Sequence, residues 1–279
     1  MVIDVPHLGV SSGSHSKILE LSARQVALLR IADSALIHSQ RLSQWCGHAP
    51  MLEEDLALSN IALDLLGQAR MLYQYLATQV GSEGRDEDWY AYFRDEKNFF
   101  NVCLVELPNG LTMSSGPRDD YAVTLAKLFV SSAYFLPYWH ALCKAPDVSL
   151  NEIAQKSVKE ARYHWDHAAQ WMLRMGDGTE LSKARAQAAL ERVWPYCNEL
   201  FHDDDLDRAA NTDFTGVLPS EIAPAWNKLI DAVLDESQLR KPAVSKMLSR
   251  GKQGEHTEGM GFLLAEMQGL ARQHPGATW

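Results

Sequence analysis

The chain has 279 residues, 46% of them hydrophobic, and a formal net charge of -10 at pH 7. This length and apolar content allow a substantial core, and we expect one large domain rather than two small ones. The acidic balance argues against nucleic-acid binding, which needs a concentrated basic surface, and no apolar run approaches the roughly 20 residues that span a bilayer.

The N-terminal part of the chain predicts a tail followed by two long helices. Residues 1–22 are small and polar and lack periodicity, which predicts a flexible tail ahead of a single domain over 23–279. Apolar spacing then predicts a first helix from Arg24 to about Trp45. In a second helix, Leu52 to Leu76, apolar residues cover most of the circumference, so we expect neighbouring helices to enclose it.

Glycine and proline divide the middle of the chain. An aromatic-rich helical region runs from Trp89 to just before Pro108, and residues 111–118 have the composition of a linker. A long helix is predicted from about Asp119 to Cys143, with a kink near its end at Pro137. Another long helix follows and ends at about Met175, with Ser149 or Asn151 as its N-terminal cap.

The last third of the chain adds shorter helices. They are predicted over 182–201, 220–236 and 258–273, and the acidic segment 202–207 is expected to be a solvated turn. No alternating run of strand length occurs, so the fold class is all-α. Four helices of roughly 25 residues with one long connection match the single-crossover bundle of the ferritin-like class, here with additional C-terminal helices.

A polar stripe follows the second predicted helix. Residues three, four and seven apart share a face of a helix, and this face carries Glu53, Asn60, Asp64, Gly67 and Gln68. In carboxylate-bridged di-iron bundles, such a stripe carries an acidic residue followed three positions later by His. Here the acid would be Asp64, and Gly67 occupies the position of the His.

A second polar stripe lies on the helix that ends at Met175. Glu160, His164, His167 and Trp171 fall between its solvent-facing and core-facing arcs. Glu160 and His164 are one turn apart and could share a ligand or a hydrogen bond. The alternative, which we favour because such pairs are common, is a boundary stripe whose histidines bond to carboxylates or to a neighbouring subunit.

The number of candidate ligands falls short of a di-iron site, which needs four carboxylates and two histidines. The first helix offers only Asp33, and the helix after the linker offers only Asp119 or Asp120 at its start. Asp64 and Glu160, the candidate acids on the other two long helices, are not followed by His three positions later. We therefore predict no metal and no catalytic residue in this chain, and vestigial di-iron positions at Asp33, Asp64, Gly67, Glu160, Tyr163 and His164.

The four cysteines suggest neither a zinc site nor a disulfide framework, because they are widely spaced and form no Cys-x-x-Cys pair. A reducing compartment fits this pattern, and we expect a cytoplasmic protein. Cys46 and His48 are close in sequence, but they have no second pair to complete a metal site.

A charged segment near the C-terminus is a separate candidate. Arg250, Lys252, Glu255 and His256 lie within seven residues of one another. The cluster could bind an anion or a partner protein. A solvated loop is an equally good interpretation of this composition.

Four segments carry a resemblance to a known family. They are RLSQWCGHAPMLEEDLALSNIALDLLGQAR, FRDEKNFFNVCLVELPNG, KEARYHWDHAAQWMLRMGDGTE and GKQGEHTEGMGFLLAEMQGLARQHPGATW. These segments resemble the C-subunit family of the bacterial phenylacetyl-CoA epoxidases, which are also called ring 1,2-phenylacetyl-CoA monooxygenases. The match runs from about Ala27 to Trp279, and the chain departs from the family in its N-terminal tail and in a slightly longer linker over 111–118.

The resemblance implies a structural, ferritin-like subunit of a multicomponent enzyme of phenylacetate catabolism. A homologous catalytic A subunit would carry the di-iron site and bind the CoA thioester, and a small B subunit would bridge the assembly. A reductase with flavin and an Fe-S centre would supply electrons from NADPH. The complex would insert one oxygen atom of O₂ into the aromatic ring as an epoxide, and no cofactor is expected in this chain.

Two further expectations concern partners and chemistry. The apolar arc of the helix from Leu52 to Leu76 is wide, so the first two helices are the natural contact with the catalytic subunit, with Leu65 on the outer arc. Packing within the chain is the alternative. The alternative function is an autonomous ferritin-like metal-dependent oxidoreductase that uses Asp64, Glu160 and His164 with ligands not recognised in the sequence.

Overall fold

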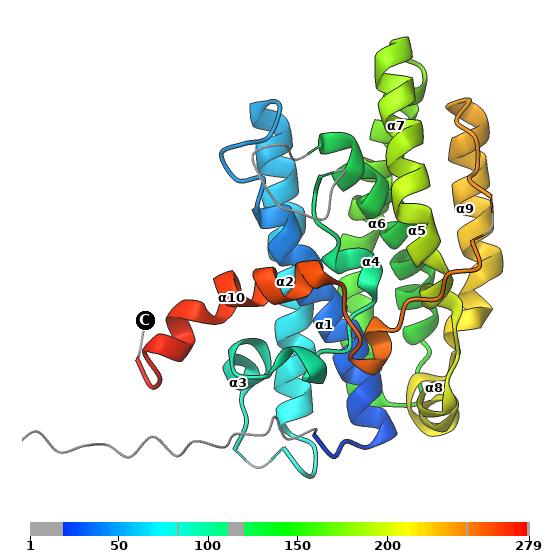
Figure 1. Cartoon of the computed structure of the whole chain (residues 1–279). Helices are drawn as coiled ribbons and strands as arrows, with labels where there is room; N and C mark the ends of the chain where they lie inside the picture. Colours follow the sequence, from blue (N-terminus) through cyan, green and yellow to red (C-terminus); the bar gives the residue numbers. More distant parts are fainter. Residues whose placement is uncertain (1–18, 83, 111–119, 244, 278–279) are drawn as a thin grey trace, which may run out of the picture.

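The computed structural model describes residues 19–82, 84–110, 120–243 and 245–277. Regular structure in these residues is helical, apart from an isolated bridge between Arg250 and Glu255 and a bridge residue at Gly110, and Figure 1 shows the arrangement. The predicted all-α class is therefore confirmed. Most of the predicted tail and all of the predicted linker lie outside the described residues.

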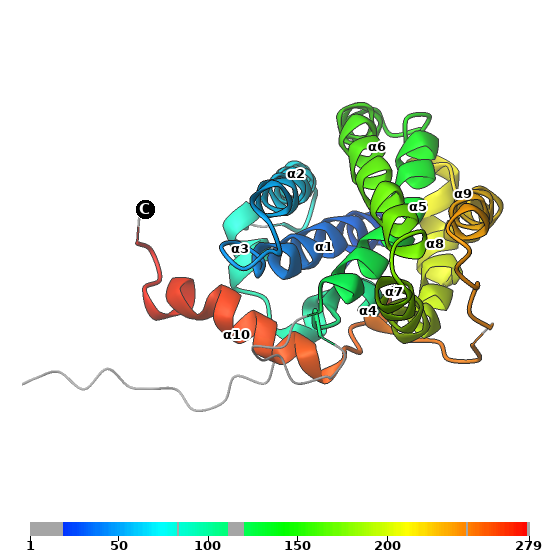
Figure 2. The same ribbon diagram turned by 90° about the horizontal axis from the view of Figure 1, so that it is seen from above.

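Two helix pairs form the bundle. Helix α1 (Ala23–Ser43) packs along α2 (Leu52–Ala77), and α5 (Tyr121–Leu142) packs along α6 (Val148–Gly176). Contacts between α2 and α6 join the pairs, and one long crossover connects α2 to α5 (Figure 2). This is the single-crossover bundle of the ferritin-like class, as predicted.

Local side chains set the ends of these helices. Ser22 and Gln25 form a capping box at the start of α1. Asp147 caps α6 by accepting a hydrogen bond from Leu150 N at 2.8 Å, so the cap precedes the two residues expected to supply it. Helix α5 continues through Pro137 to Leu142.

The crossover contains three short helices in place of the one helical region that was expected. They are α3 (Glu87–Tyr92), a 3-10 turn (Glu96–Asn98) and α4 (Cys103–Glu106). Side chains of α1 explain the interruption, because Asp33 accepts a hydrogen bond from Phe100 N and Ser34 accepts one from Val102 N. These backbone groups therefore bond across the fold instead of continuing a helix.

The C-terminal third covers the bundle from two sides. Helices α7 and α9 contact α5 and α6, whereas α10 contacts the crossover and extends away from the bundle (Figure 1). No helix in the described part of the chain combines the length and apolarity required to cross a membrane. The elements are α7 (Glu180–Val193), a 3-10 helix (Trp194–Phe201), α8 (Asp205–Ala210), a π-helical turn (Asn211–Thr215), a 3-10 turn (Pro219–Ile222), α9 (Ala223–Glu236), a 3-10 turn (Gly251–Gln253) and α10 (Glu258–Gln273).

Helices α1 and α5 form the centre of the molecule, and α2 lies at its edge. Seventeen of the 22 residues of α5 are buried, compared with 10 of the 26 of α2. The expectation that neighbours enclose α2 is therefore wrong, since Leu63 is 64% exposed while Leu65, two positions later and on the opposite side of the helix, is 7% exposed. Apolar residues on every side of a helix do not show whether other helices of the same chain pack against every side of it.

Candidate functional site

A small cavity of about 20 Å³ lies in the middle of the bundle, where all four long helices contribute side chains. Helix α1 supplies His38, α2 supplies Gln68, α5 supplies Ser131 and Ser132, and α6 supplies His164. Ferritin-like bundles hold their metal ligands at this place, projecting inward from facing helices. The remaining lining residues are apolar or aromatic, namely Leu65, Leu128, Phe135, Trp139 and Ala161.

Two polar pairs join α2 to α6 beside this cavity. Gln68 Nε2 donates a hydrogen bond to Glu160 Oε2 at 2.8 Å, and His164 Nε2 lies 3.1 Å from Asp64 Oδ2. The two helices run antiparallel. The earlier residue on α2, Asp64, therefore meets the later one on α6, His164, and the order is reversed for the other pair. The structure thus places Asp64, Glu160 and His164 on facing turns of α2 and α6, where Asp64 pairs with His164 and Glu160 pairs with Gln68.

Glu160 is half-buried, and its surroundings act on its charge in opposite directions. Burial raises the pKa of the carboxyl group, and the hydrogen bond from Gln68 partly offsets this. The nearby charge of Asp64 raises the pKa further, and His164 lowers it. The net direction is upward, so Glu160 holds a proton more readily than an exposed glutamate does.

Gly67 and Tyr163, which occupy the places of the metal-binding histidines in a di-iron bundle, do not face the centre. A Cβ atom built on Gly67 would have no neighbour within 4 Å, and Tyr163 is exposed. A histidine at either position would therefore lie outside the cavity. The side chains that reach the cavity from these two helices lie four positions after each acid: Gln68 follows Asp64, and His164 follows Glu160. A step of four residues turns a helix by one full turn plus 40°, so such residues share a face.

Asp33 belongs to a different polar cluster, on the side of α1 that faces the crossover. It accepts hydrogen bonds from Arg94 Nη1 at 3.0 Å, from Tyr73 Oη at 2.6 Å and from Phe100 N at 2.8 Å. The side chains of Asp33 and Arg94 have no exposed surface. Asp33 is therefore the counter-ion of a buried arginine and does not line the central cavity.

His38 is the α1 residue that lines the cavity, and the sequence reasoning missed it. It is 2% exposed, and its Nε2 atom has no hydrogen-bond partner among the described residues. Burial lowers the pKa of His38 to about 3, with smaller contributions from Lys127 and His164. The imidazole is therefore neutral at physiological pH. The sequence does contain a signal for His38, because it follows Ser34 by one turn and so forms a polar face on a helix rich in apolar residues.

A further polar cluster lies along α2 and α6. Tyr121 Oη donates a hydrogen bond to Glu54 Oε2, and His167 Nε2 lies 3.3 Å from the same oxygen, outside hydrogen-bond geometry. Burial lowers the pKa of His167, and the charge of Glu54 partly offsets this. Glu54 lies in the first turn of α2, and it is buried and bonded to Tyr121 of α5.

The side chains at the bundle centre do not fit two iron ions. Within the described ranges, no group of three His, Cys, Asp or Glu residues is placed to hold a metal ion. Helix α5 contributes serines to the cavity, and the carboxylate of Asp120 instead caps its first turn at Ala122 N. Asp119, the other candidate on this helix, lies outside the described residues. The donor set therefore falls short of the four carboxylates and two histidines that a di-iron centre requires.

The charged cluster near the C-terminus separates into different interactions. Arg250 pairs with Glu255 at 3.1 Å on the surface, and Lys252 Nζ donates to Asp207 Oδ2 at 2.8 Å. His256 is buried, and its Nδ1 lies 2.7 Å from Glu106 Oε2. Lys252 and His256 are thus engaged within the chain, and only Arg250 and Glu255 present charge to solvent. A role in anion or partner binding stays a prediction.

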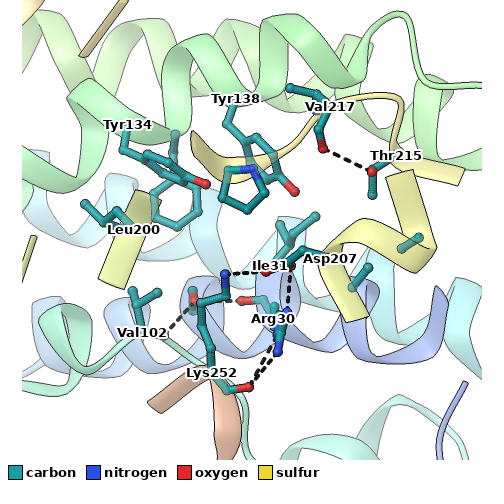
Figure 3. A pocket seen from close by; sticks show the side chains of 15 residues that line it. Arg30, Ile31, Val102, Tyr134, Tyr138, Leu200, Asp207, Thr215, Val217 and Lys252 are labelled. Atoms are coloured by element: carbon teal, nitrogen blue, oxygen red, sulfur yellow. Dashed lines mark hydrogen bonds and ion pairs between the residues drawn. The ribbon is translucent and has the colours of Figure 1, made fainter. Parts of the chain in front are cut away.

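A second cavity, of about 40 Å³, lies between α1, α5 and α8. Figure 3 shows Tyr134 and Tyr138 on one side of it and Arg30, Asp207 and Lys252 on the other. Arg30 donates to Asp207 Oδ1 at 2.6 Å and also binds the carboxylate of Asp204. His202 and Asp205 are exposed, as expected of a solvated turn, but the expectation is wrong for Asp204 and Asp207, which are the counter-ions of a buried arginine of α1.

The four cysteines are free. Cys46 is exposed in the turn after α1, where the Cys46 carbonyl oxygen lies 3.0 Å from His48 Nδ1. His48 thus contacts the backbone of Cys46 and not its thiol, so the two side chains do not form a pair of metal ligands.

The fold and the bundle centre together define a ferritin-like protein whose described residues lack a di-iron ligand set. A family model described as "Phenylacetic acid catabolic protein" matches residues 17–279, and the chain belongs to this family. The chain is also similar to the C subunit of the 1,2-phenylacetyl-CoA epoxidase of Escherichia coli strain K12. The two are 41% identical over 251 residues, which cover 90% of this chain and 97% of that protein.

Proposed function

We propose that this chain is a structural, non-catalytic subunit of a 1,2-phenylacetyl-CoA epoxidase in phenylacetate catabolism. The observation that carries the proposal is the 41% identity to the C subunit of the Escherichia coli enzyme over nearly the whole of both chains. The bundle centre supports the non-catalytic part, because Asp64 pairs with His164 and Gln68 pairs with Glu160. Side chains that bond to each other hold α2 against α6 and leave few free ligands for a metal.

In this proposal a homologous subunit with an intact ligand set carries the di-iron centre, which activates O₂ for insertion into the aromatic ring. A small bridging subunit and a reductase with flavin, an Fe-S centre and NADPH complete the enzyme. The role of this chain is to bind and support the catalytic subunit. It contributes packing surface rather than groups that touch the substrate.

The outer face of α2 is the surface that we propose for contact with the catalytic subunit. Four leucines at helical spacing form this outer leucine row, and all are exposed. Such a row on one face is typical of a protein contact. Helix α1, the other expected contact, is enclosed within the chain. The outer leucine row consists of Leu52, Leu56, Leu63 and Leu66.

Leu65, expected on the outer arc, points into the core instead. A charged substitution there would unfold the chain and would not test the interface. The informative variant is Leu63→Glu with Leu66→Glu, and the matched control is Leu181→Glu, an exposed leucine of α7. After co-expression with the catalytic subunit, the double variant should lose co-purification, and the control should keep it.

Circular dichroism and thermal unfolding of the isolated variants provide the necessary check. Each should keep the helical content and the melting temperature of the parent chain, because exposed substitutions rarely change stability by more than about 0.5 kcal/mol. Normal co-purification of the double variant would place the interface elsewhere on the molecule.

Metal analysis tests the non-catalytic role directly. The isolated chain should contain far less than one iron per molecule after expression in iron-supplemented medium. In the assembled enzyme, Asp64→Asn and His164→Gln should change turnover by no more than about threefold, through stability alone. Two irons per chain, or a loss of several orders of magnitude in rate with normal assembly, would instead support the autonomous metalloenzyme.

A further inference from the structure

The imidazole of His38 is an exception to the rule that buried polar groups are hydrogen-bonded. Its side chain is only 2% exposed, and no described residue offers a hydrogen bond to its Nε2 atom. An unmatched buried nitrogen loses its hydration without compensation, which is unfavourable and uncommon in folded proteins. This atom therefore points to a ligand that bonds to it within the bundle.

The cavity that His38 lines has the size and polarity for one small molecule. Its volume is about 20 Å³, and a water molecule needs roughly 10–15 Å³ of such space and two to four polar partners. The hydroxyls of Ser131 and Ser132 donate to Leu128 O, at 3.2 and 2.6 Å, and each keeps lone pairs that can accept. Gln68 lines the same space and uses its Nε2 towards Glu160.

The surrounding charges favour a neutral ligand over a cation. The buried ammonium group of Lys127 is close enough to His38 to disfavour a second positive charge there. Among the described residues, no carboxylate lines the cavity, and the carboxylates bonded to its lining residues, Asp64 and Glu160, are engaged by His164 and Gln68. A divalent metal ion in this cavity would have one unengaged imidazole and no unengaged carboxylate.

We propose that one ordered water molecule occupies the central cavity and hydrogen-bonds to His38 Nε2 and to the hydroxyl of Ser131 or Ser132 or the amide of Gln68. Water can donate or accept, so it suits either tautomer of a neutral His38. The molecule would link α1 to α5 or α2 at the place where related bundles use a metal to hold their helices together. This inference holds whether or not the chain is an epoxidase subunit.

A crystal structure of the full-length chain at better than about 2 Å resolution is the first test. We expect a well-ordered peak at a hydrogen-bonding distance of about 2.7–3.2 Å from His38 Nε2. A cavity without such a peak would overturn the proposal. So would a peak at about 2.0–2.1 Å with anomalous scattering, which would identify a metal ion such as zinc.

A count of long-lived internal waters in solution, by oxygen-17 magnetic relaxation dispersion, is the second test. The variant His38→Leu removes the nitrogen and keeps similar bulk, and His140→Leu is the control on the exposed end of α5. His38→Leu should lose one long-lived water relative to the parent chain, and His140→Leu should lose none. An unchanged count in a folded His38→Leu protein would refute the proposal. If that variant does not fold, the crystal structure of the parent chain decides.

Discussion

Replacing Asp33 with alanine should strongly destabilise the fold, because the substitution leaves a buried arginine without its counter-ion. Neither Asp33 nor Arg94 has exposed side-chain surface. Burial alone would lower the pKa of Arg94, but the charge and hydrogen bonds of Asp33, together with Tyr73 and Tyr90, more than offset this, and the pKa lies above its ordinary value. Because a guanidinium stays protonated in proteins, the variant keeps a buried positive charge without its counter-ion.

The expected loss follows from what the carboxylate holds. Breaking a buried ion pair by removing one partner costs roughly 3–5 kcal/mol. Tyr73 Oη and Phe100 N also lose their acceptor, which places the loss towards the upper end of that range. For a chain of this size, 1 kcal/mol changes the melting temperature by roughly 2–4 °C. We therefore expect a fall of about 6–20 °C.

Urea unfolding followed by far-ultraviolet circular dichroism measures this loss. The control is Asp213→Ala, which breaks the exposed ion pair between Asp213 and Arg24 and should leave the unfolding midpoint in place. Arg94→Met should be less harmful than Asp33→Ala, because it leaves a carboxylate with two remaining donors. A loss below about 1 kcal/mol for Asp33→Ala would refute the reasoning that this ion pair holds the crossover to α1.

Two further predictions concern glycines and pH. Gly67→Ala should stabilise the chain by about 0.5–1 kcal/mol, since a Cβ there meets nothing within 4 Å. Gly176→Ala should destabilise it by about 1–3 kcal/mol, since a Cβ would lie 2.3 Å from Ser237 O, and thermal unfolding that gave the opposite order would contradict both. Burial alone would lower the pKa of His256, but the hydrogen bond and the charge of Glu106, with smaller contributions from Phe99 O and Glu96, raise it above its ordinary value of 6.5, so protonated His256 stabilises the fold. This stabilisation is complete below pH 6.5 and is lost as pH rises through the folded-state pKa, so the unfolding free energy of the parent chain relative to His256→Gln should fall across that range.

The positions of the long helices could be read from the sequence. The segment predicted over 258–273 is α10 to the residue. The predicted start of α2 is the observed one, and its predicted end differs by one residue. Helices are local structures, in which backbone hydrogen bonds join residues four apart, so apolar periodicity and capping residues nearby are sufficient to place them. The same periodicity was sufficient for the all-α class and for the pattern of two long helix pairs with one crossover.

The sequence singled out Asp64 on α2 and Glu160 and His164 on α6, because each lies in a polar stripe of its helix, and the packing of α2 against α6 then placed these stripes side by side. The sequence did not identify His38, and it assigned Asp33 to the wrong cluster. Which face of α1 meets the cavity depends on where α5 and the crossover pack, and no local pattern records this. His38 became a candidate only when its unpaired Nε2 and the neighbouring cavity were visible.

Tertiary structure alone decided which side chains are covered and which charges are paired. Arg30 meets Asp207 across 177 positions of sequence, so the acidic segment 202–207 could be interpreted locally only as a solvated turn. The outer leucine row of α2 shows the converse, since an apolar helix at the edge of a bundle has no neighbour on one side. Hydrogen bonding along a helix is fixed within one turn, whereas burial and ion pairing depend on segments that fold against it from elsewhere in the chain.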